Sequence, residues 1–242
     1  FAAMAAGVCS GYIMAFLQTK LGVESILAGI IVNTGLYTVN LAAMGFSSNL
    51  SLFKCETVYS LGKGLFGATW YKLGISAVIV VIVCLLLKWF LGTRLGLSIR
   101  ATGDNEDMVR ASSINPGFTV TVGLCVSGAM TALSGCLIGQ YQKSCDINLG
   151  TGMVTIALAS LIIGETLVGK RTVTRRMIGA VLGSCLYRFA IAIALRLHVP
   201  AECLKLVSSV IVAVAIAAPY IKSRAAFQRK KMAAAKGGNA SC

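Results

Sequence analysis

Charged side chains are scarce in this 242-residue chain: they make up 12% of it, and only eight are acidic. An ordinary soluble domain carries about 25% charged residues. Hydrophobic residues account for 57%, and the mean hydropathy is +0.82. A soluble fold of this composition would expose large apolar patches, and a disordered chain would contain far fewer apolar residues. The composition therefore argues against both classes and predicts an integral membrane protein.

The patterns of several kinds of catalytic site are also missing. One histidine and nine scattered cysteines without a C-x-x-C pair give neither a zinc nor a haem signature, so we expect no metal site. Paired aspartates, a Ser/Lys arrangement and H-E-x-x-H are absent, which argues against a membrane-embedded enzyme. The predicted spans carry no group of acids at mid-membrane, which argues against an ion-coupled secondary transporter.

Long apolar runs dominate what is present. A membrane-spanning helix needs about 20 mostly apolar residues. We predict an all-α bundle of seven or eight spans over 1–221, with residues 47–73 as an external loop that contains an interfacial helix. Because the chain begins with Phe1, we also expect a further span ahead of it. The predicted spans are 1–17, 26–46, 74–91, 117–139, 153–168, 177–196 and 204–221.

The basic residues predict how these spans are oriented. Ten of the fourteen net positive charges lie in the loop 169–176 and the tail 222–242, and such segments stay on the cytoplasmic side. The loop 92–116 then also lies inside, and 143–152 and 197–203 lie outside. The tail has one aromatic residue, so it lacks the interleaved pattern of a nucleic-acid site, and we expect a disordered tail and no nucleic-acid partner.

Small residues recur at four-residue spacing within three spans. Such stripes let helices approach closely in lipid, where packing rather than the hydrophobic effect drives association. We therefore predict close helix contacts along these faces. The stripes are Ala3, Gly7 and Gly11; Gly128, Ala132, Gly135 and Gly139; and Gly179 and Gly183.

The cytoplasmic loop reads RATGDNEDMVRASSINP from Arg100 to Pro116. Asp104 or Asn105 is suited to cap a helix whose first turn is acidic, as the helix dipole favours. Pro116 prevents that helix from continuing. The loop thus predicts a short helix on the cytoplasmic face, and its neutral balance of charges favours a protein partner over lipid. An ordinary turn between two spans remains an equal alternative at this point.

This loop resembles the cytoplasmic loop of permeases of the branched-chain amino acid and ribose/xylose importer superfamily, where the pattern is roughly R-A-x-G-x-N-x-x-A-A-x-x-x-G-I. Arg100, Ala101, Gly103, Asn105 and Ile114 match; Met108 and Val109 replace the small pair, and Ser113 replaces a glycine. A second segment, 156–184, is similar to the family's glycine-rich A-x-x-x-I-G-G-T-x-x-x-G-G segment. Here Glu165 and Lys170 stand in place of glycines. The closest likeness is to a branch paired with binding proteins for aromatic amino acids.

The resemblance implies a type II-like transmembrane domain of an ATP-binding cassette (ABC) importer in the bacterial inner membrane. Its partners would be a separate ATPase that binds ATP and Mg²⁺, a second permease subunit taken as an identical copy, and an external binding protein. This chain lacks a G-x-x-x-x-G-K-[ST] segment and would hydrolyse no ATP itself. The coupling helix would span 101–114, with contacts from Ala101, Gly103, Asp104, Asn105, Met108, Arg110, Ala111 and Ile114.

A polar stripe in the span 26–46 is the candidate solute pathway. Asn33, Tyr37 and Asn40 share one helical face, with Thr34 beside it. Polar side chains in lipid must form hydrogen bonds or face water. The stripe therefore predicts either a solute pathway or an interhelical hydrogen-bond clamp. An amino acid is the expected solute by resemblance, and a sugar or nucleoside is the alternative.

Overall fold

The computed structural model describes residues 1–52, 57–61, 71–150, 152–169 and 172–196, together with 210, 213 and 217. The chain divides into two compact units, Phe1–Leu149 and Gly150–Cys242. The first contains α1 (Ala2–Lys20), α2 (Ser25–Ala43), β1 (Asn49–Ser51), α3 (Val58–Leu61), α4 (Tyr71–Gly92), α5 (Arg94–Asp104), α6 (Glu106–Ala111), α7 (Pro116–Gln142) and β2 (Ser144–Asp146). The second contains α8 (Met153–Val168) and α9 (Val173–Arg196).

The helices confirm the all-α prediction in the described part of the chain. Five are long and apolar enough to cross a membrane, namely α1, α2, α4, α7 and residues 173–194 of α9. The 16-residue α8 is apolar but shorter, with a rise of about 24 Å. In the predicted external loop, α3 is a single turn. The predicted span 204–221 and the tail 222–242 lie almost entirely outside the described residues.

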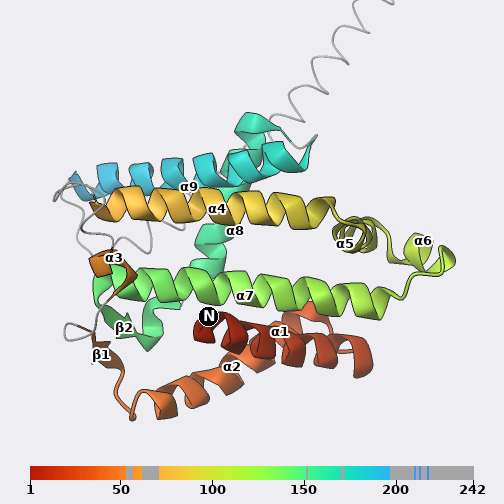
Figure 1. The fold of residues 1–242 in the computed structure, drawn as a ribbon, viewed down its shortest axis with the longest axis horizontal. Helices are drawn as coiled ribbons and strands as arrows, with labels where there is room; N and C mark the ends of the chain where they lie inside the picture. Colours follow the sequence, from red (N-terminus) through yellow and green to blue (C-terminus); the bar gives the residue numbers. More distant parts are fainter. Residues whose placement is uncertain are drawn as a thin grey trace, which may run out of the picture. The chain divides into compact units, whose positions relative to one another are not determined.

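Glycines hold α1 and α7 together in the first unit, where the two helices run antiparallel and side by side (Figure 1). A methyl group on Gly11 would lie 2.5 Å from the Leu124 carbonyl oxygen, and one on Gly7 would collide with the backbone of Gly128. The predicted close approach is therefore confirmed at Gly7, Gly11 and Gly128. A methyl group on Gly135 would meet nothing within 4 Å.

The second unit contains the pair α8 and α9, which also pack closely through glycines. A methyl group on Gly183 would lie 2.7 Å from the backbone nitrogen of Gly164, and Gly179 packs against Gly164 as well. The predicted Gly179 and Gly183 contact is therefore confirmed. Beside it, Tyr187 is buried against Ala159 of α8.

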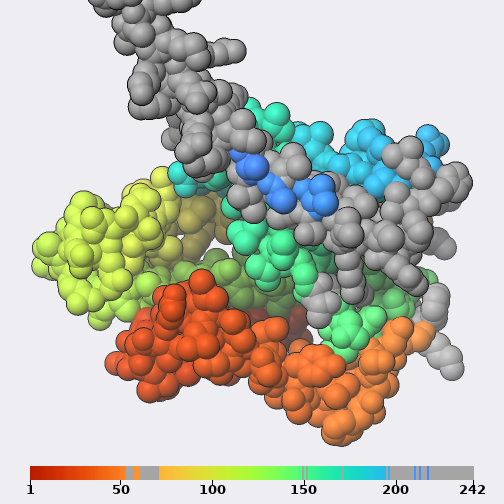
Figure 2. Space-filling model, turned by 180° about the vertical axis from the view of Figure 1, so that it is seen from behind, coloured from red at the N-terminus to blue at the C-terminus, as the bar shows by residue number. Residues whose placement is uncertain are grey.

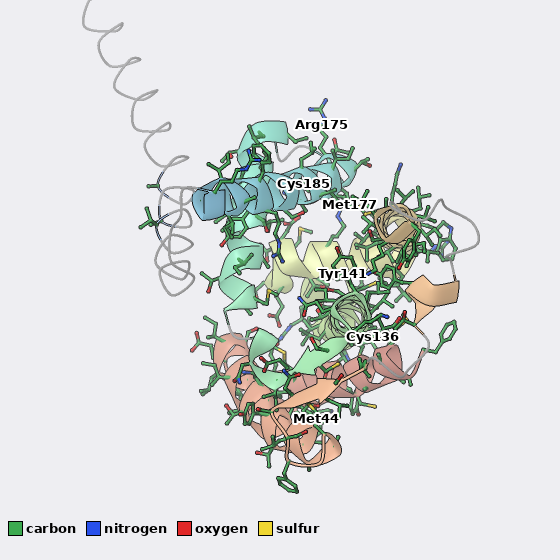
Figure 3. The ribbon with its side chains drawn as sticks, turned by 90° about the vertical axis from the view of Figure 1, so that its left-hand side faces the viewer. Met44, Cys136, Tyr141, Arg175, Met177 and Cys185 are labelled. Carbon is green, nitrogen blue, oxygen red and sulfur yellow. The ribbon has the colours of Figure 1, made fainter. Side chains whose placement is uncertain are left out.

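One end of the first unit carries a two-stranded antiparallel sheet. β1 pairs with β2 so that Asn49 lies opposite Asp146 and Ser51 opposite Ser144. Figure 3 looks onto this end, with α7 seen nearly along its axis and Tyr141 labelled on it. The two strands belong to the segments 47–73 and 143–152, both predicted to be external, and their pairing places these segments at the same end of the unit.

The other end is built by a sharp corner between α4 and α5. Thr93 caps α5 by accepting a hydrogen bond from the Gly96 amide at 3.3 Å. Any side chain on Gly96 would collide with the backbone of Phe90 and Leu91, so the corner requires glycine there. In Figure 1 α5 is seen end-on while α4 runs across the view, so α5 lies across the ends of the spans.

Candidate functional site

The short helix predicted in the 92–116 loop is present as α6, and Asn105 begins it. The Asn105 side-chain oxygen accepts a hydrogen bond from the Met108 amide at 3.0 Å. Glu106 and Asp107 occupy the first turn, where negative charge is favoured by the helix dipole. Arg110 forms an exposed ion pair with Glu106 at 3.0 Å, one helical turn away. The local sequence therefore supplies the cap and the first-turn charges that begin this helix.

The prediction of a single coupling helix over 101–114 is wrong. Residues 101–104 form the last turn of α5, and α6 begins only at Glu106. Asn105 is extended, with φ −158° and ψ 107°, so it ends one helix and caps the next. We call residues 101–114 the docking segment; it consists of the end of α5, the whole of α6 and the turn that follows.

The end of α6 is a left-handed turn at Ser113, with φ of 61°. The Ser113 amide donates to the Arg110 carbonyl oxygen, and the Ile114 amide donates to the Val109 carbonyl oxygen, both at 3.3 Å. These two hydrogen bonds make a Schellman motif, whose left-handed residue is usually glycine. This geometry explains why the family pattern has glycine at this position, where the present chain has Ser113.

Replacing Ser113 by glycine is expected to stabilise the protein by about 0.5–1 kcal/mol, because glycine adopts positive φ without the steric penalty of a side chain. The melting temperature of the detergent-solubilised protein should rise by about 1–4 °C. Ser112→Gly is the matched control, since Ser112 has φ of −86° and gains nothing from glycine. An equal rise in both variants would contradict the explanation.

Two buried groups attach the docking segment to the bundle. The hydroxyl oxygens of Thr102 on α5 and Thr119 on α7 lie 2.8 Å apart, and both side chains are buried. Val109 is 1% exposed and anchors α6. The docking segment is therefore packed onto the bundle through buried side chains rather than joined to it by a loose linker.

The rest of the docking segment faces outward. Met108 is 58% exposed although it is apolar, and Figure 2 shows α5 and α6 (yellow-green) as a projection at the left edge. Ile114, at the other end of the segment, is also exposed, so the projection presents apolar side chains beside its charged ones. Ala101 is half-buried, and the other residues predicted to contact the ATPase are exposed: Gly103, Asp104, Asn105, Met108, Arg110, Ala111 and Ile114.

The predicted solute pathway lies on the exposed face of α2. Thr34 donates to the Ile30 carbonyl oxygen at 2.9 Å, and the side chains of Asn33, Tyr37 and Asn40 have no hydrogen-bond partner among the described residues. Within the described part of this subunit, the alternative hydrogen-bond clamp is therefore not formed. Ala28 is the one residue of α2 that is buried.

An aromatic cluster at the C-terminal end of α7 was not predicted from the sequence. The rings of Tyr59 and Tyr141 meet edge to face at 5.9 Å, and the Lys72 ammonium lies 5.2 Å from the centre of the Tyr141 ring. Gln140 accepts a hydrogen bond from the Val58 amide at 3.1 Å. Burial, and secondly Tyr141, raise the pKa of the Tyr59 phenol. Because Val58 and Gln140 are 82 positions apart, and the ring contacts also join distant segments, local patterns carry no signal of the cluster.

Sequence comparison decides the family. A model of the family described as branched-chain amino acid transport system, permease component, matches residues 1–229. The chain belongs to this permease family. The tyrosine transport system permease protein of Clostridioides difficile (strain R20291) is 33% identical over 210 residues, which cover 87% of this chain and 68% of the relative. The ribose import permease protein of Haemophilus influenzae is 30% identical over 181 residues, which cover 72% of this chain and 51% of the relative. No solved structure matches the chain.

The permease is therefore a multi-pass membrane protein and a transport subunit of an ABC transporter. An autoinducer 2 import system permease protein of Photorhabdus laumondii is also similar, at 25% identity over 185 residues, which cover 74% of this chain and 51% of the relative. The relatives thus span permeases named for an amino acid, a sugar and a signalling molecule. The family membership confirms the prediction drawn from the two sequence motifs.

Proposed function

We propose that the permease forms half of an import pathway for an amino acid in the bacterial inner membrane. An external binding protein delivers the solute, and a separate ATPase, which holds ATP and Mg²⁺, drives its movement. Tyrosine is the first solute to test, because a relative that is 33% identical is named for tyrosine transport. A sugar is the second candidate, favoured by the similarity to a ribose permease.

The docking segment is the observation that carries this proposal. It contains the capped helix α6 and projects from one end of the spans with Met108 exposed. The buried Thr102 and Thr119 pair connects it to α7. Closure of an ATPase pair on such a rigid projection would shift packed helices between inward- and outward-open arrangements.

Reconstitution of the complete transporter tests the proposal. The permease should co-purify with its ATPase, and a solute-loaded binding protein should stimulate ATP hydrolysis. Uptake into proteoliposomes should require ATP in the lumen and should not depend on an ion gradient. Uptake driven by a proton or sodium gradient without ATP would instead make the chain a secondary transporter.

We assign the solute pathway to the polar face of α2. Three polar side chains without partners in the described chain cannot face lipid without a free-energy penalty. Two environments would remove that penalty: a water-filled pathway, or an interface where a second permease subunit forms hydrogen bonds with these side chains. Asn33 lies near the middle of α2, at the depth where a passing solute needs weak polar contacts.

Replacing Asn33 or Asn40 by leucine is expected to reduce the uptake rate about tenfold, which corresponds to about 1.4 kcal/mol in the barrier. The amount of protein in the membrane should stay unchanged, because neither side chain has a partner among the described residues. Val39→Leu is the matched control, since Val39 is 61% exposed on the same helix. If protein level and uptake fall in parallel in the asparagine variants, the stripe packs against another subunit instead.

A further inference from the structure

A pocket of about 650 Å³ lies beside the docking segment, between the end of α1 and the turn that joins α6 to α7. This volume is within the range of small-molecule sites, about 300–1,000 Å³. Gln18 and Thr19 line it from α1, and Glu106 and Arg110 line it from α6. A ligand in this pocket would therefore touch both a membrane span and the helix proposed to move with the ATPase.

Gln18 supplies an unused hydrogen-bonding group at this pocket. Its side-chain oxygen is buried and has no hydrogen-bond partner among the described residues. The neighbouring polar groups are committed: Thr19 donates to the Ala15 carbonyl oxygen at 2.7 Å, and Asn115 accepts from the Gly117 amide at 3.0 Å. A buried acceptor without a partner is uncommon in folded proteins, and a ligand that donates an N–H bond would satisfy it.

Charges of both signs line the same pocket. Glu106 and Arg110 pair at 3.0 Å, but their side chains are 57% and 68% exposed, so the pair opens readily to other partners. A guanidinium group binds carboxylates in a planar fork, and a carboxylate or amide oxygen accepts from an ammonium group. Ile114, Pro116 and Val120 add an apolar wall. These groups complement a free amino acid, with its carboxylate, its ammonium group and its side chain.

We propose that this pocket binds a free L-α-amino acid from the cytosol and that the bound amino acid slows transport. The ligand would bridge Gln18 on α1 and Arg110 on α6, and so hold α6 against the span when the ATPase closes. Import would then fall as its product accumulates inside the cell. The proposal rests on the proposed function as an amino acid importer, and it concerns a site separate from the polar face of α2.

Equilibrium binding tests the site itself. Tritiated L-tyrosine is added, without binding protein, to the permease–ATPase complex in nanodiscs. Tyramine lacks the carboxylate and 3-(4-hydroxyphenyl)propionate lacks the ammonium group, so each should compete at least about tenfold more weakly than L-tyrosine. Gln18→Met, which keeps the side-chain length, should weaken binding about tenfold, whereas Val39→Leu, at an exposed position of α2, should leave it unchanged. The proposal would be overturned if the complex does not bind L-tyrosine, or if the two analogues compete as well as L-tyrosine does. It would also be overturned if Gln18→Met leaves binding unchanged while the control variant weakens it.

Inhibition is measured in proteoliposomes with ATP in the lumen, as the ratio of labelled tyrosine uptake with and without lumenal L-tyrosine. The wild-type ratio should fall well below one, and the Gln18→Met ratio should stay near one. If uptake occurs but the wild-type ratio stays at one, this proposal is wrong while the proposed function stands. If no ATP-dependent uptake occurs at all, the proposed function fails, and the binding experiment still decides the pocket.

Discussion

Replacing Gly128 by alanine is expected to lower the melting temperature of the detergent-solubilised permease by about 5–10 °C. An added methyl group would collide with the backbone of Gly7, and a backbone neighbour cannot swing aside as a flexible side chain can. Forcing α1 and α7 apart also removes the close packing that drives helix association in lipid, so we expect a loss of about 2–3 kcal/mol. Thermal unfolding followed by size-exclusion chromatography measures the change.

Gly135→Ala on the same helix is the matched control. A methyl group at Gly135 meets nothing within 4 Å. Alanine favours a helix over glycine by about 1 kcal/mol at either position, so the difference between the two variants isolates the packing term. Equal melting temperatures would contradict the contact between α1 and α7.

Replacing Met108 by glutamate is expected to abolish ATP-driven uptake while leaving the permease in the membrane. Met108 is 58% exposed, so the substitution disturbs little within the chain itself. In a docked complex the added charge would be buried against the ATPase, where the loss of a central contact weakens binding by about 2–4 kcal/mol. That loss raises the dissociation constant at least about 30-fold. Co-purification of the ATPase and uptake rate are measured together.

Met108→Leu is the control for this prediction, because it conserves volume and apolar character and should keep uptake near that of the wild type. Val109→Asp provides the opposite reference, since Val109 is 1% exposed and a buried charge there should destabilise the permease itself. Unchanged ATPase association in Met108→Glu would contradict the role of the docking segment.

The spans and the presence of α6 were predictable from the sequence because both depend on local properties. Apolar run length determines where a helix can cross a membrane, and Asn105 with the acids after it determines where α6 begins. The family followed from motif order and spacing. Local properties did not show that Asn105 also ends α5, because that role depends on how α5 packs across α7 through Thr102.

Contacts between distant segments account for what the sequence did not predict. Gly128 and Gly135 lie in one stripe, yet only Gly128 packs against α1. The reason is that α7 is longer than α1 and continues beyond the end of their contact. The pairing of β1 with β2 joins residues nearly 100 positions apart. The unpaired Gln18 oxygen is likewise visible only once α1 ends beside α6. Periodicity identifies a face but not what covers it.

The position of Met108 relative to the membrane tests the central claim most directly. A cysteine is placed at Met108 or at Asn49 in a background freed of the nine native cysteines, and intact cells are treated with a membrane-impermeant maleimide. We expect Asn49→Cys, on β1 at the opposite end of the unit, to be labelled in intact cells. Met108→Cys should be labelled only after permeabilisation, and less so when the ATPase is bound. Labelling of Met108→Cys in intact cells would place the docking segment outside and contradict the account.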